Sequence, residues 1–178
     1  NEEKGIKVFE RWIAVDKKTK VRERSGKMIL HCTPDQVMNI ITDAKKTNVW
    51  MSYVESCEVL KKNSCTEWYV YTMLDAPWPF GKQDMVSRYV VSTDNQTNIT
   101  KLSIYRQLNM VPEKKGIERL DTFNAEWIIE KVDNQTVNVT FTTKSTQPPK
   151  YPAWAQDPVV RKVFLQNLEK LKDYLGQS

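Results

Sequence analysis

The sequence predicts an α+β fold that combines a long antiparallel β-meander with one long C-terminal helix. Three observations predict it. Extended segments in the middle of the chain are joined by short polar turns, such as residues 93–98 and 133–136, which is typical of an antiparallel meander. One short helical pattern interrupts the extended segments near the start, and the last segment is amphipathic with helical spacing. At 178 residues, the whole chain (1–178) is expected to form a single domain.

The N-terminal part reads as two extended segments followed by a helix. Residues 6–15 and 21–30 are extended and flank a polar turn. Thr33 then has the pattern of a helix N-cap, because Pro34 follows at the first helical position and Gln36 at the capping-box position. The apolar face of this helix consists of Val37, Ile40, Ile41 and Ala44.

The middle of the chain is dominated by strands. Extended segments are expected over residues 55–61, 68–74, 85–92, 101–108, 118–132 and 137–145. Between the second and third of these, Pro77, Trp78 and Pro79 form a rigid corner, because two prolines remove backbone donors that a central strand needs. A corner of this kind, with a large aromatic side chain at the rim of a sheet, predicts the mouth of a β-walled container.

The C-terminal part is expected to be a rigid connector followed by a helix. Residues 148–152 contain three prolines, and Trp154 is expected to anchor this connector. Asp157 and Pro158 predict the helix start, and Gly176 predicts its end. The apolar stripe of the helix consists of Val160, Val163, Phe164, Leu168, Leu171 and Leu175.

The charge and composition of the chain limit the classes of partner that it is expected to bind. The net charge of +5 is spread along the chain, which predicts a solubilising surface, and contact with an anionic membrane surface is the alternative. No basic stripe with interleaved aromatic residues indicates nucleic-acid binding. No run of about 20 apolar residues predicts a membrane span. Because the chain begins with Asn1, both a cytoplasmic location and export after removal of a leader stay open. Of the three cysteines, Cys57 and Cys65 could pair, although buried free thiols are favoured.

Catalytic and cofactor motifs are not apparent. His31 is the single histidine, and its neighbour Cys32 would point to the opposite face of a strand, which argues against a nucleophilic pair. The five glycines are too far apart for a phosphate-binding loop, and metal-ligand spacing is absent. Glu126 and Glu130 share a strand face that is expected to be solvated. We therefore expect no catalytic residue, no metal and no cofactor.

The order of the motifs resembles the START (steroidogenic acute regulatory protein-related lipid transfer) domains of the Bet v 1-like, or SRPBCC, superfamily. The residues that carry the resemblance are 5–11, Asp43, Trp50, 77–79, Asp84, Val86 and 152–154. The family usually has an arginine before the aspartate, and here Gln83 takes that place. The resemblance implies a helix-grip fold: a curved antiparallel sheet wrapped around the C-terminal helix, with a hydrophobic tunnel that in family members binds sterols, phospholipids or other apolar molecules.

Candidate ligand-binding residues follow from the strand patterns and the implied tunnel. Arg106 lies on the same strand face as Leu102 and Ile104, so it either faces a ligand head group or extends into solvent at a sheet edge. Tyr71 and Met73 share a strand face that belongs either to the core or to the cavity. Trp78, Phe80 and Trp154 either surround the tunnel mouth or fasten loops to the sheet. The predicted ligand-binding set is Arg106, Tyr71, Met73, Phe123, Trp127, Trp154 and Phe164.

These observations favour a non-enzymatic protein that binds, or binds and transfers, a lipid or another hydrophobic small molecule. Its partners would be that molecule and, transiently, a membrane surface, with no nucleic acid. One alternative is a cyclase or dehydratase of the same superfamily acting on a polyketide-like substrate, which would need a general acid or base in the cavity. The other is a domain with a collapsed cavity that mediates protein contacts.

Overall fold

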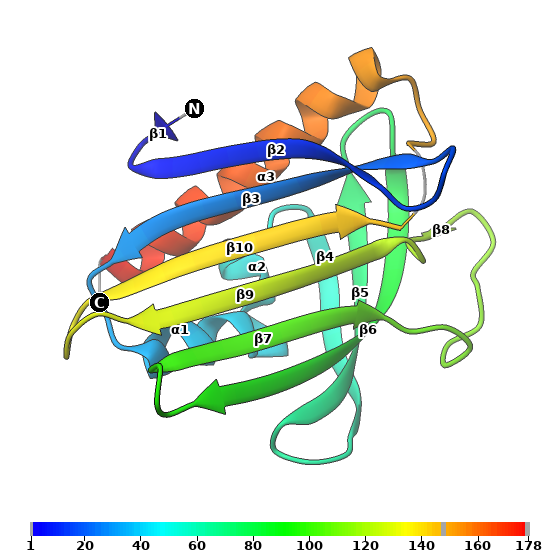
Figure 1. Cartoon of the computed structure of the whole chain (residues 1–178). Coiled ribbons are helices and arrows are strands. Elements are labelled where there is room, and N and C mark those ends of the chain that lie inside the picture. Colours follow the sequence, from blue (N-terminus) through cyan, green and yellow to red (C-terminus); the bar gives the residue numbers. More distant parts are fainter. Residues whose placement is uncertain (1, 147–148, 177–178) are drawn as a thin grey trace.

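A computed structural model describes residues 2–146 and 149–176 of the chain. In these residues a curved antiparallel sheet wraps around the C-terminal helix α3, Ala153–Gly176 (Figure 1), so the predicted helix-grip fold is confirmed. The strands are β1 Glu2–Glu3, β2 Ile6–Ala14, β3 Lys20–Leu30, β4 Val54–Lys62, β5 Glu67–Ala76, β6 Gly81–Asp94, β7 Ile99–Arg106, β8 Glu118–Arg119, β9 Phe123–Lys131 and β10 Val137–Ser145. The other helices are α1 Pro34–Ile41, the 3₁₀ turn η1 Ala44–Lys46 and α2 Thr47–Trp50.

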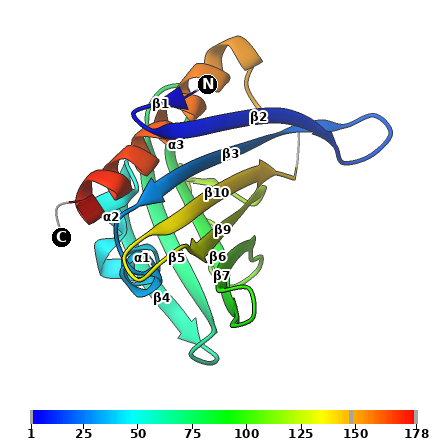
Figure 2. The same ribbon diagram turned by 60° about the vertical axis from the view of Figure 1, so that its left-hand side comes forward.

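The sheet brings the two ends of the chain together. Its strand order is β1-β2-β3-β10-β9-β7-β6-β5-β4, with antiparallel neighbours throughout, and β8 pairs in parallel with β6 beyond the end of β7. Helix α3 packs against β2, β3 and α2. The turned view in Figure 2 shows α1 and α2 on the same side of the sheet as α3. The inner face of the sheet and these helices therefore enclose one hydrophobic core.

The local signals at α1 are confirmed. The side chain of Thr33 accepts a hydrogen bond from the backbone N–H of Gln36, and Gln36 Oε1 accepts from the backbone N–H of Thr33 at 2.8 Å. This reciprocal pair satisfies two donors that the first helical turn leaves free. The helix ends at Ile41, so Ala44 belongs to the following 3₁₀ turn.

The start of α3 differs from the prediction. The helix begins at Ala153, because the carbonyl of Pro152 accepts from the backbone N–H groups of Ala155 and Gln156, and Pro158 therefore lies inside the helix. Asp157 does not cap the helix. Its carboxylate accepts from Arg22 Nη2 at 2.6 Å and Arg24 Nη2 at 3.2 Å, and these ion pairs fix the first turns of α3 to β3.

Two further expectations need correction. The extended segment predicted over residues 118–132 divides into β8 and β9, because residues 120–122 turn between them. The cysteines are free thiols, as favoured, but only Cys32 is buried: Cys57 is half-buried and Cys65 is exposed.

The centre of the core is a chain of aromatic rings that links α2, the sheet and α3. Trp127 has no exposed surface and stacks on Phe141 with ring centroids 4.0 Å apart. Trp50 contacts the other side of Trp127 edge-on at 5.5 Å, and Phe141 stacks on Phe164 of the helix at 5.5 Å. Aromatic contacts of this kind add stability beyond the burial of the rings.

Helix α3 packs closely on the sheet at Gly26 of β3. A Cβ atom at this position would collide with Leu168 Cδ1 and would lie 3.2 Å from a ring carbon of Phe164. Leu168 is fully buried. A side chain at residue 26 would therefore require Leu168 or the helix to shift.

Candidate functional site

A pocket of about 270 Å³ lies between the inner face of the sheet and helix α3. Its size is near the lower end of the roughly 300–1,000 Å³ of small-molecule sites. It is lined by Trp50, Met51, Ser52, Tyr53, Leu74, Ala76, Pro77, Phe80, Gln83, Met85, Tyr89, Ile104, Leu120, Phe123, Ala125, Phe141, Thr143, Val159, Val160, Val163, Phe164 and Asn167. The volume shows that the cavity is not collapsed, and the mostly apolar lining suits a hydrophobic molecule.

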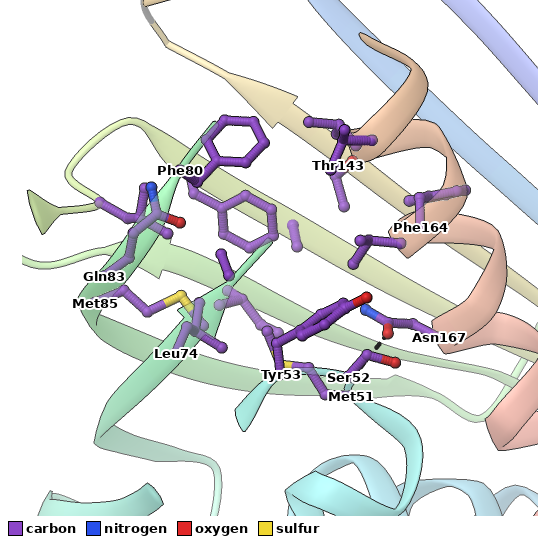
Figure 3. Close-up of a pocket in the computed structure, with 18 of the residues that line it drawn as sticks. Met51, Ser52, Tyr53, Leu74, Phe80, Gln83, Met85, Thr143, Phe164 and Asn167 are labelled. Carbon is purple, nitrogen blue, oxygen red and sulfur yellow. Dashed lines mark hydrogen bonds between the residues drawn. The ribbon is translucent and has the colours of Figure 1, made fainter. Parts of the chain in front are cut away.

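Strand alternation and helical spacing place these side chains. On β6, Gln83, Met85 and Tyr89 point to the inner face, while Asp84 points to the outer face, because successive side chains alternate along a strand. On α3, Val160, Phe164 and Asn167 follow at intervals of three and four residues and so share one side of the helix. Figure 3 shows Phe164 and Asn167 reaching into the space opposite Leu74 and Met85.

The pocket has one polar corner, formed where the loop after α2 meets α3. The backbone N–H of Ser52 donates to Asn167 Oδ1 at 2.8 Å (Figure 3). Both side chains are at least nine-tenths buried. Ser52 Oγ is buried and has no hydrogen-bond partner among the described residues. Tyr53 holds this loop in place, because its carbonyl accepts from the backbone N–H of Asp75 at the edge of β5.

The Pro-rich corner forms part of the pocket wall. Pro77 and Phe80 line the pocket, and the Phe80 ring contacts the ring of Tyr151 edge-on, with centroids 5.6 Å apart. Phe80 therefore fastens the corner to the segment before α3. In contrast, Trp78 and Trp154 are 72% and 77% exposed, so both project into solvent and neither lines the pocket.

Tyr71 and Met73 lie on the outer face of the sheet and not in the pocket. The loop of residues 107–117 folds over this face, where Lys114 Nζ lies 4.9 Å from the centre of the Tyr71 ring and 3.9 Å from Met73 Sδ. Both faces of β5 are therefore covered. Because of this, the apolar alternation of β5 did not reveal which face meets the pocket.

Under the same loop lies a buried ion pair. Asp84 is 1% exposed and accepts from Arg119 Nε at 2.6 Å and from the hydroxyl of Tyr71 at 2.8 Å. Burial would raise the pKa of Asp84, but the hydrogen bonds from Arg119 and Tyr71 and the nearby positive charges outweigh it and leave the pKa below its ordinary value. This pair fastens β8 and the loop to β6.

Arg106 lies outside the pocket as well. It shares the inward face of Leu102 and Ile104, but it is the last residue of β7 and is exposed. Its Nη1 donates to the carbonyl of Asp121 at 2.8 Å. The strand ends at Arg106, so its guanidinium does not enter the core. The structure matches the alternative of an exposed position at a sheet edge, and Arg106 is not part of the pocket wall.

Of the predicted ligand-binding residues, only Phe123 and Phe164 lie on the pocket wall. Trp127 is in the layer behind it, against Phe141. The ligand-binding residues predicted from the sequence did not include Ser52, Gln83 or Asn167. Asn167 could have been found, because it is a polar residue on the apolar stripe of the helix. Ser52 and Gln83 carry no such signal, since they depend on how a loop and a strand are placed.

Comparison with known families agrees with this geometry. Residues 30–172 match the model of the family described as polyketide cyclase / dehydrase and lipid transport. The chain belongs to this family. An uncharacterized protein of Pseudomonas aeruginosa is 22% identical over 172 residues, which cover 96% of this chain and 82% of the relative.

Solved structures place the fold among START domains. A STAR-related lipid transfer protein of Xanthomonas axonopodis superposes with a TM-score of 0.85 at 25% identity and covers 98% of this chain and 96% of its own. Human StAR-related lipid transfer protein 5 has a TM-score of 0.84 at 14% identity, and the superposition covers 99% of this chain and 85% of the human chain. The ZhuI aromatase/cyclase of Streptomyces has a TM-score of 0.61 at 13% identity, and the superposition covers 87% of this chain and 93% of the Streptomyces chain. The chain therefore has the START-type fold of the SRPBCC superfamily, a superfamily suited to hydrophobic ligands.

No helix within residues 2–146 and 149–176 is long and apolar enough to cross a membrane. In the same ranges, no group of three or more His, Cys, Asp or Glu side chains gathers as metal ligands would.

Proposed function

We propose that the protein binds a lipid or a similar hydrophobic small molecule between the sheet and helix α3, without catalysing a reaction. The observation that carries this proposal is the unfilled, largely apolar pocket of about 270 Å³. Each Å² of apolar ligand surface that enters it would contribute ~25 cal/mol to binding. The STAR-related lipid transfer protein of Xanthomonas axonopodis, at 25% identity over nearly the whole chain, supports the same class of ligand.

The titratable side chains on the pocket wall support binding over catalysis. Among the described lining residues they are Tyr53 and Tyr89. Burial raises the pKa of Tyr89 far above neutrality, so its hydroxyl stays protonated and can donate a hydrogen bond but not act as a base. A cyclase or dehydratase acting on a polyketide-like substrate would need a general base, and Tyr89 does not supply one at neutral pH.

Filling the pocket is expected to abolish ligand binding. Ala125 is a small, buried lining residue of β9, so Ala125→Phe would place a ring in the space that the ligand needs. Native mass spectrometry of freshly purified protein should show a hydrophobic adduct on the wild type and no adduct on Ala125→Phe. The control is Ala14→Phe, a similar change at an exposed position. A ligand-free wild type that also binds no member of a lipid panel would overturn the proposal.

As part of the same proposal, the protein contacts a membrane surface transiently, through two exposed tryptophans near the pocket. Trp78 and Trp154 project from the two segments that Phe80 and Tyr151 hold together beside the pocket. Tryptophan favours the interface between lipid and water because one part of its ring system is apolar and the other polar. The neighbouring cations Lys82 and Lys150 are already paired with Glu55 and Glu118. The tryptophans would therefore provide most of the attraction.

Replacing both tryptophans is expected to weaken vesicle binding. The double variant Trp78→Ser, Trp154→Ser should reduce co-flotation with phosphatidylcholine–phosphatidylserine vesicles roughly fivefold or more, since two exposed aromatic side chains no longer enter the bilayer. The matched control is Phe9→Ser with Ile29→Ser, two exposed apolar residues of β2 and β3. Equal loss in the two double variants would mean that the two tryptophans have no special role.

A further inference from the structure

The wall of the pocket carries no charged side chain among the described residues. Its polar members are all neutral: Ser52, Tyr53, Gln83, Tyr89, Thr143 and Asn167. Charged groups near the pocket are occupied elsewhere, since Asp84 and Arg119 pair on the outer face and Glu118 binds Lys150. A charged group taken into such a site from water would lose its hydration without gaining a counter-charge, which is strongly unfavourable.

The polar corner offers donors for a single oxygen atom. The backbone N–H of Ser52 donates to the side-chain amide of Asn167, so the atom that faces it must be Oδ1, which leaves Nδ2 as the donor end of the amide. Ser52 Oγ, on a side chain more than nine-tenths buried, has no partner among the described residues. Trp50 Nε1, on a further lining residue, is likewise without one. Buried polar groups are normally hydrogen-bonded, so these donors indicate a ligand.

We propose that the ligand is an uncharged amphiphile whose single hydroxyl or carbonyl oxygen is bound by Ser52 Oγ and Asn167 Nδ2, while the apolar walls bind the rest of the molecule. This inference rests on the proposed function and narrows its ligand class. It selects neutral lipids that carry one oxygen function. It disfavours fatty-acid carboxylates and lipids whose charged head group would have to enter the pocket.

Three ten-carbon probes of similar length separate these classes. Each is titrated against the protein loaded with N-phenyl-1-naphthylamine, an uncharged dye whose fluorescence rises in apolar sites. At pH 8, decan-1-ol should displace the dye at a concentration at least roughly tenfold lower than decanoate, because of the cost of burying the carboxylate. Decane should bind more weakly than decan-1-ol by a factor of about three to ten, the usual net value of one hydrogen bond.

Ser52→Ala tests the anchor directly. The variant should lower the affinity for decan-1-ol about three- to tenfold and leave the affinities for decane and for the dye unchanged. Because Ser52 Oγ has no protein partner, the variant should keep or slightly raise the Tm of the ligand-free protein. The control is Ser103→Ala, at a β7 position outside the pocket.

The outcomes distinguish the two proposals. If the dye does not bind at all, the proposed function fails and the ligand class fails with it. If the dye binds but decanoate competes as well as decan-1-ol, only the uncharged class is overturned. If Ser52→Ala leaves the affinity for decan-1-ol unchanged, the anchor is overturned.

Discussion

Arg119→Met is expected to lower the free energy of unfolding by about 3–5 kcal/mol, the usual loss when one partner of a buried ion pair is removed. The variant would leave the Asp84 carboxylate, 1% exposed, with the hydroxyl of Tyr71 as its remaining side-chain donor. It would also free the carbonyls of Val111 and Pro112, which Arg119 binds in the loop. Urea denaturation followed by circular dichroism measures the change.

A double-mutant cycle separates the pair from general damage to the loop. The double variant Asp84→Asn, Arg119→Met should lose less unfolding free energy than the sum of the two single variants. The reason is that the double variant removes both charges, whereas each single variant leaves one buried charge unpaired. Arg88→Met is the matched control: Arg88 pairs with Glu67 in a more exposed position, so about 0–1 kcal/mol is expected. Additive single effects would show that the ion pair itself contributes little.

The same pair predicts how stability responds to acid. The folded-state pKa of Asp84 lies below its ordinary value, so this carboxylate stabilises the fold fully above about pH 4. The stabilisation is lost as the pH falls through the folded-state pKa. The stability of the Asp84→Asn, Arg119→Met double variant should therefore fall less steeply below pH 4 than that of the wild type.

Trp127→Ala is expected to cost about 3–5 kcal/mol of unfolding free energy. The indole has no exposed surface and lies between Trp50 and Phe141, so its removal would leave a large cavity and interrupt the chain of rings from α2 to α3. Thermal and urea unfolding measure the effect. Trp154→Ala removes the same side chain from an exposed position and should change stability by less than about 0.5 kcal/mol.

Trp127→Phe then tests whether this residue belongs to the core or to the ligand site. The phenyl ring keeps most of the packing with Phe141, so the fold should persist with a smaller loss of stability. Because Trp127 lies behind the lining, the affinity for an apolar dye should stay within about twofold of the wild type. A large loss of affinity in a well-folded Trp127→Phe protein would show that Trp127 takes part in ligand binding.

The sequence was most informative where the signal is local. The capping box at Thr33 depends on four neighbouring residues, and the structure contains it as expected. The hairpin turns at residues 93–98 and 133–136 fixed the meander for the same reason. The amphipathic stripe of α3 was recognisable because its period does not depend on the partner it packs against.

The candidate site was less predictable because it depends on contacts that are remote in sequence. Tyr71 and Met73 are covered by a loop about forty residues later in the chain, so they are apolar because of that loop and not because they line the pocket. Arg106 follows the inward alternation of its strand but stands at the end where the sheet stops covering it. Ser52 became a candidate only through its position opposite Asn167, 115 residues away.

The missing side chain at Gly26 has a consequence for ligand size. The helix rests on β3 there through Leu168 and Phe164, and Phe164 is also part of the pocket wall. A larger residue at this backbone position would require Leu168 or helix α3 to shift, and a shift of the helix would move Phe164 and change the volume of the pocket. A residue outside the pocket lining can thus influence the pocket volume through the helix.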